Sequence, residues 1–167
     1  MLKARDFIAI NPQHYSDEVA RLESISAQIG SQPSEAKRQL WSEFLDIVTN
    51  RDEELRARIL ACNMLGGYQA ELNLNRPQVV KRLKSVLEDE FIVSKFSKNV
   101  FRRRELYLRQ MDPIKSCFLP ILLSTLLRID FENTHQIVGR IVDKMENSQF
   151  REALSRLYEK QNPTRQP

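Results

Sequence analysis

The chain has few of the residues that mark specialised folds. Its 167 residues include two cysteines, four glycines, seven prolines and one tryptophan. Two cysteines, Cys62 and Cys117, cannot form the disulfide framework of a small secreted domain, and such scarcity is typical of a reducing, intracellular compartment. The low glycine and proline content excludes collagen-like and low-complexity chains. With 41% hydrophobic and 29% charged residues, the composition is that of a globular protein.

Long hydrophobic runs are also missing. The most apolar stretch, Cys117–Leu127, has eleven residues and includes Pro120, Ser124 and Thr125, whereas a membrane span needs about 20 apolar residues. The N-terminal segment lacks the long apolar run of a signal peptide. We therefore expect a soluble cytoplasmic protein that has no membrane partner.

Motifs with a known chemical mechanism are absent as well. The sequence contains no P-loop, no Gly-x-Gly-x-x-Gly turn and no Gly-x-Ser-x-Gly elbow. His14, His135, Cys62 and Cys117 are isolated, at none of the spacings that place two ligands on one metal ion. The sequence therefore predicts no enzymatic activity, no cofactor and no metal site.

What the sequence does contain is helical periodicity along nearly its whole length. Apolar residues recur at helical spacing, and the alternation typical of strands is absent. Helix starts are marked by Ser, Asp or Asn followed by an acidic residue or Pro. The predicted helices begin near Ser16, Ser34, Asp52, Pro77, Phe91, Asp112, Asn133 and Asn147. We predict an all-α fold of about eight short helices, with a single domain over residues 1–160 and a disordered tail over 161–167.

Two architectures fit these helices. Paired as hairpins, they start near residues 16, 52, 92 and 133, and this spacing matches the ~34 to ~47 residue period of helical-hairpin solenoids. The segment from Asp52 to Gly66 resembles a HEAT-repeat helix, because Arg58, Ala61 and Leu65-Gly66 fall where such helices place an Arg, a small residue and a terminal Leu-Gly. The resemblance implies a short HEAT-like array. It covers fifteen residues and the other pairs lack it, so an irregular compact bundle is the alternative.

Positive charge is concentrated in one segment. Residues 95–109 carry a net charge of +5, while the whole chain carries +4. The six basic residues of this segment, here named the basic stripe, are Lys95, Lys98, Arg102, Arg103, Arg104 and Arg109. Positions 95, 98, 102 and 109 share one face of a helix. Three interpretations stand: a solvated or internally paired face, a docking surface for an acidic protein, and a contact for nucleic-acid phosphates.

Two helices are apolar over a wide arc. The first contains Trp41, for which core packing and an exposed anchor for a partner are the two interpretations. The second, Phe118–Ile129, is broader still, which is typical of a helix central in a bundle or covered by another chain.

Together these features favour a protein that acts by binding rather than by catalysis. We expect a non-catalytic protein–protein interaction module, an adaptor or regulatory subunit that docks through the basic stripe or an exposed apolar helix face. A partner with an acidic surface follows if the basic stripe is the site. A nucleic-acid-binding protein that uses the same stripe is the alternative, and the sequence leaves the oligomeric state open.

Overall fold

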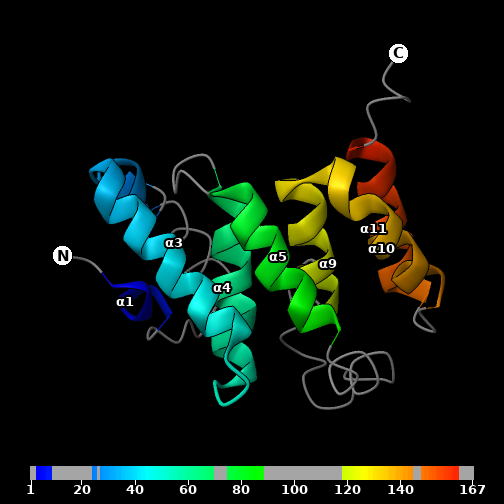
Figure 1. The fold of residues 1–167 in the computed structure, drawn as a ribbon, viewed down its shortest axis with the longest axis horizontal. Coiled ribbons are helices and arrows are strands. Elements are labelled where there is room, and N and C mark those ends of the chain that lie inside the picture. Colours follow the sequence, from blue (N-terminus) through cyan, green and yellow to red (C-terminus); the bar gives the residue numbers. More distant parts are fainter. Residues whose placement is uncertain are drawn as a thin grey trace. The chain divides into compact units, whose positions relative to one another are not determined.

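The computed structural model describes residues 3–8, 24–25, 27–69, 75–88, 118–144 and 148–161. Within these ranges the secondary structure is helical and includes no strand, which confirms the predicted all-α class (Figure 1). The chain forms two compact units, residues 1–75 and residues 76–167. None of the described helices has the length and apolarity that a membrane crossing requires.

The first unit is built on a helical hairpin. Helices α3 (Ser34–Thr49) and α4 (Leu55–Gly67) pack against each other, and the short helix α1 (Ala4–Ile8) contacts both (Figure 1). Helix α3 has the predicted bounds, and its apolar residues form one broad buried face. That face consists of Leu40, Trp41, Phe44, Leu45, Ile47 and Val48. From α4, the core receives Ile59, Ala61, Cys62, Met64 and Leu65.

Side chains bind carbonyls near the C-terminus of α3, where those of the last four residues have no partner within the helix. The Thr49 hydroxyl donates to the carbonyl of Leu45 at 2.9 Å. Arg58, which is only 6% exposed, donates from Nε to the carbonyl of Val48 at 2.9 Å. A cation at a helix C-terminus also interacts favourably with the helix dipole. Arg58 of α4 therefore joins the two helices of the hairpin.

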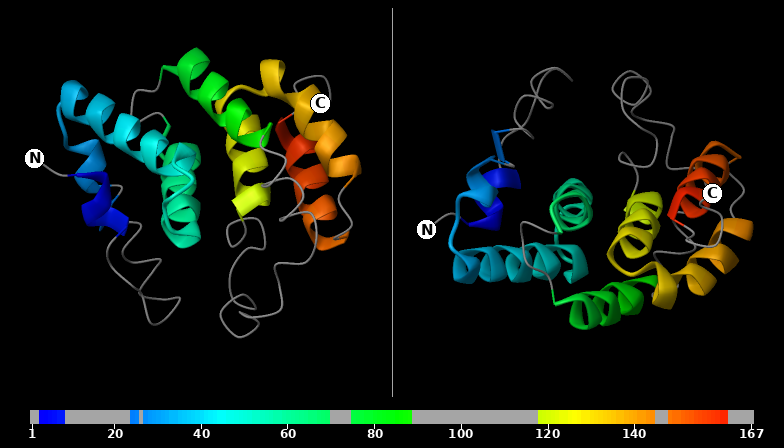
Figure 2. Two further views of the ribbon diagram at one scale, coloured as in Figure 1. Left: turned by 60° about the horizontal axis from the view of Figure 1, so that its bottom comes forward. Right: turned by 90° about the horizontal axis from the view of Figure 1, so that it is seen from above.

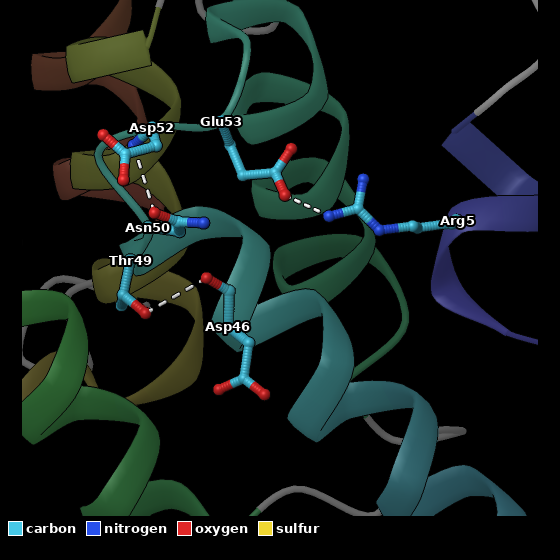
Figure 3. Close-up of polar contacts among 6 residues, drawn as sticks. All are labelled: Arg5, Asp46, Thr49, Asn50, Asp52 and Glu53. Carbon is cyan, nitrogen blue, oxygen red and sulfur yellow. Dashed lines mark hydrogen bonds and ion pairs between the residues drawn. The ribbon is translucent and has the colours of Figure 1, made fainter.

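Helix α4 begins at Leu55, three residues after the predicted start at Asp52. The backbone N–H of Asp52 donates to Oδ1 of Asn50 at 3.0 Å (Figure 3). Such an Asx turn gives the backbone an alternative to the first helical turn. Asp52 therefore lies in the turn between α3 and α4.

The second unit is built around α9 (Phe118–Ile129). Its other described helices, α5 (Arg76–Leu87), α10 (Phe131–Asp143) and α11 (Ser148–Gln161), each contact α9 (Figure 2). Every residue of α9 except Arg128 is buried. This position explains the apolar circumference seen in the sequence, because a helix with neighbours on several sides has no solvent face.

A single residue, Asp130, joins α9 to α10. Its side chain accepts the backbone N–H of Asn133 at 3.3 Å, so Asp130 is the N-cap and α10 begins at Phe131 rather than at the predicted Asn133. The buried Thr134 hydroxyl donates to the carbonyl of Leu126 in α9 at 3.1 Å. Lys84 of α5 donates to the carbonyl of Asn133 at 2.8 Å. These bonds fix the start of α10 against its neighbours.

Some predictions fall outside these ranges. The helices expected near Phe91 and Asp112 lie at residues the structure does not describe, and of the helix expected from Ser16 only residues 24–25 and 27–30 are described, as helical. The single domain over 1–160, the disordered tail over 161–167 and the choice between a HEAT-like array and a bundle stay predictions.

Candidate functional site

The basic stripe lies outside the described residues. Lys95, Lys98, Arg102, Arg103, Arg104 and Arg109 all fall between residues 89 and 117. Their role in binding a partner or nucleic acid stays a prediction.

Trp41 lies in the core of the first unit. Its side chain is 7% exposed, and within the described part of the chain its indole Nε1 is buried without a hydrogen-bond partner. Buried indole N–H groups usually find one. The position agrees with core packing, and a role as partner anchor stays a prediction.

A groove lies between α10 and α11 of the second unit. It has a volume of about 450 Å³, within the range of roughly 300–1,000 Å³ that ligand pockets occupy. We name it the α10–α11 groove, and it is lined by Gly139, Val142, Asp143, Leu154, Ser155, Tyr158 and Glu159. Positions 139, 142 and 143 lie on one face of α10, and 154, 155, 158 and 159 on one face of α11, because residues three and four apart are neighbours on a helix.

A glycine keeps the α10 wall of the groove open. Gly139 lies in the interior of α10, where glycine costs about 0.8–1.0 kcal/mol relative to alanine. A Cβ added at Gly139 would meet nothing within 4 Å. Close packing therefore does not require a glycine at this position. The missing side chain instead adds open space to the groove.

Three rings on α10 and α11 hold one wall in place. Phe131 and His135 stack with centroids 5.3 Å apart and planes inclined by 14°. Tyr158 lies 5.3 Å from Phe131 and 6.4 Å from His135. A ring nitrogen of His135, Nδ1, is 3.0 Å from the carbonyl of Phe131. Tyr158 thus belongs both to this cluster and to the groove, and the cluster fixes the orientation of its ring.

The lining of the groove mixes apolar and polar groups. Leu154 is fully buried and Val142 is 7% exposed, while Asp143 and Glu159 are exposed carboxylates. The half-buried Ser155 and Tyr158 each contribute a hydroxyl group. Such a surface can take up an apolar side chain and interact with a cation beside it.

No metal centre is present in the part of the chain that the structure describes, where no three His, Cys, Asp or Glu side chains gather. Of the residues considered as isolated ligands, Cys62 is buried in α4 and His135 belongs to the ring cluster. His14 and Cys117 lie outside the described ranges.

Sequence reasoning missed the α10–α11 groove. One local signal was available: Gly139 interrupts the apolar run from Ile137 to Val142, where an amphipathic helix gains nothing from a glycine. The pairing of α10 with α11, which creates the opposite wall, is a tertiary contact and has no such signal.

Comparison with known proteins finds no match for the chain among protein-family models, curated proteins or solved structures.

Proposed function

We propose that the chain is a non-catalytic protein–protein interaction module, an adaptor or regulatory subunit, and that the α10–α11 groove is one of its docking surfaces. The observation that carries the proposal is the groove itself, which lies beside an interior glycine and has both polar and apolar groups in its lining. We also propose a cytoplasmic location, supported by the low cysteine content.

The lining of the groove indicates which side chains a partner would place in it. A volume of about 450 Å³ accommodates one or two large side chains, and the half-buried Tyr158 ring beside Val142 favours apolar or aromatic ones. The exposed carboxylate of Asp143 favours a Lys or Arg next to it. The partner segment therefore carries a large apolar or aromatic residue flanked by a basic residue.

A peptide-display selection tests this proposal. The full chain is used as bait, and peptides that also bind a Gly139→Leu variant are removed, because Gly139 lines the groove and a leucine side chain there would occupy part of its volume. Gly139→Ala is the matched control that leaves most of the volume open. We expect peptides with an aromatic or leucine residue beside Lys or Arg that bind the wild-type and Gly139→Ala chains. A selection in which every binder also binds Gly139→Leu would contradict the proposal.

The basic stripe supports a second docking surface of the same module. Its net charge of +5 within fifteen residues suits an acidic partner. Charge reversal at Arg102 and Arg104 should weaken binding of such a partner and reduce its salt dependence. If both quantities are unchanged, the stripe is not the docking surface.

The same concentration of charge favours nucleic-acid binding as a second candidate function. Binding to phosphates would fall steeply with salt concentration. Fluorescence anisotropy with labelled single-stranded RNA and duplex DNA, at low and near-physiological salt, separates this candidate from an acidic protein partner. Binding that persists near physiological salt and disappears in a folded Arg102/Arg103/Arg104→Glu variant would support it. No binding at low salt would exclude it.

A further inference from the structure

Helix α1 is seated on the α3–α4 hairpin by three different kinds of contact. The backbone N–H of Ala4 donates to Oε2 of Glu43 at 2.7 Å. The guanidinium of Arg5 forms an ion pair with Glu53 (Figure 3). The Phe7 ring lies 6.2 Å from that of Phe44, tilted by 45°.

These contacts define a preformed surface, here named the α1 site, made of Glu43, Phe44 and Glu53. Glu43 and Phe44 belong to α3, and Glu53 lies in the turn before α4. The second carboxylate oxygen of Glu43 accepts from the Gln39 side chain at 3.1 Å, which helps to orient the group that receives Ala4. The Glu53 side chain is only 14% exposed.

The helix that occupies this site cannot be stable alone. It has five residues, whereas isolated helices shorter than about 12–15 residues are marginal in water. Locally, the Asp6 side chain accepts from the Lys3 N–H at 2.9 Å and caps the single turn. Residues 4–8 therefore stay helical chiefly because they are bound to the α1 site.

The α3–α4 hairpin keeps a core of its own when α1 is released. Helices α3 and α4 pack against each other and each carries a fully buried leucine, Leu45 and Leu65, and Arg58 bonds α4 to α3 without α1. The Arg5 side chain is 69% exposed, so water competes for its guanidinium. Local opening of α1 is therefore easier than unfolding of the hairpin.

We propose that the α1 site is a peptide-binding site and that residues 3–8 are its exchangeable occupant. The competing partner is a short segment that starts a helix, carries a basic residue at its second helical position and an aromatic residue two positions later. Each feature of the segment binds one group of the site. Its N–H donates to Glu43, its cation pairs with Glu53 and its ring packs on Phe44. This proposal does not depend on the α10–α11 groove.

The test measures binding of a labelled peptide, residues 1–10, to full-length chains. Arg5→Glu/Phe7→Ala weakens the internal occupant, and Lys81→Glu is the matched control because it makes the same charge change at an exposed side chain of α5. When α1 occupies the site, the apparent affinity of a competitor is its intrinsic affinity multiplied by the fraction of chains in which the site is empty. We expect the Arg5→Glu/Phe7→Ala chain to bind the peptide at least tenfold more tightly than the wild-type and Lys81→Glu chains. A peptide that itself carries Arg5→Glu should lose this advantage.

Two results would overturn the proposal. One is a folded Arg5→Glu/Phe7→Ala chain that binds the peptide no better than the control chain. The other comes from hydrogen exchange on the wild-type chain, which decides the matter even if the double variant fails to fold. Amides of residues 3–8 should exchange through local opening, faster than the core amides of α3 and α4. Exchange of both at the rate of global unfolding would show that α1 is not exchangeable.

Discussion

Arg58 is the clearest case in which one residue determines local architecture. It is a buried cation that bonds the carbonyl of Val48, at the end of the neighbouring helix. The sequence singled out this position through its resemblance to a HEAT-repeat helix, while the structure supplies the physical reason for an arginine there. Only a long side chain with a donor at its end can leave α4 and reach the C-terminus of α3.

Replacing Arg58 should therefore destabilise the first unit. Arg58→Met keeps much of the packing but leaves a buried carbonyl without its donor, which costs about 1–3 kcal/mol. Relief from desolvating the cation offsets part of this loss. The matched control is Arg38→Met, which removes an exposed pair with Glu35 and should change the free energy of unfolding by less than about 0.5 kcal/mol. Urea unfolding measures both, and equal effects would contradict the role given to Arg58.

Replacing Gly139 should change the free energy of unfolding in the opposite direction. Gly139→Ala should raise the free energy of unfolding by about 0.5–1 kcal/mol, because the helix gains propensity and the new methyl group meets nothing. Gly67→Ala, at the last position of α4, should gain less. Destabilisation by Gly139→Ala would mean that the glycine is needed for packing and that the groove is not the reason for it.

At the scale of elements, side-chain hydrogen bonds explain where the predicted helix starts fail. Helix α3 has the predicted bounds, and its N-cap, Pro33, makes no side-chain hydrogen bond. The starts of α4 and α10 differ from prediction because polar side chains compete for backbone N–H groups. Asn50 takes that of Asp52, and Asp130 takes that of Asn133.

The N-cap of α10 has a direct test. Asp130→Ala removes the acceptor of the Asn133 N–H and should cost about 1 kcal/mol. The same change at Asp143, the last residue of α10, removes a negative charge from the unfavourable end of the helix dipole. Its effect should be neutral or stabilising by up to about 0.5 kcal/mol. Chemical denaturation of the two variants would refute the assignment if Asp143→Ala were the more destabilising.

The groove could not be predicted by the same rules. Val142 and Leu154 are apolar residues at helical spacing, and both are buried. The spacing of apolar residues does not predict the groove between α10 and α11, because the groove depends on how the two amphipathic helices pack. The contact of α1 with Glu43 and Glu53 joins residues 39 and 48 positions apart and was equally out of reach.

At the scale of the whole molecule, the single tryptophan distinguishes one domain from two. Trp41 reports on the first unit, whereas circular dichroism reports on all helices. Leu122→Ala in the buried α9 should cost about 2–5 kcal/mol. If residues 1–160 form one cooperative domain, as the sequence predicts, the Trp41 fluorescence midpoint and the dichroism midpoint should fall together. An unchanged Trp41 midpoint would show two domains.

The chain as a whole is proposed to act by binding other proteins, and affinity capture with matched baits tests that claim most directly. Lysate of the source cells would be passed over the wild-type, Gly139→Ala, Gly139→Leu and Arg102/Arg103/Arg104→Glu chains, and the bound proteins quantified by mass spectrometry. We expect at least one protein that the wild-type and Gly139→Ala chains retain and the Gly139→Leu chain loses. A protein lost only by the arginine variant would move the docking surface to the basic stripe. Identical proteins on all four baits would contradict the account.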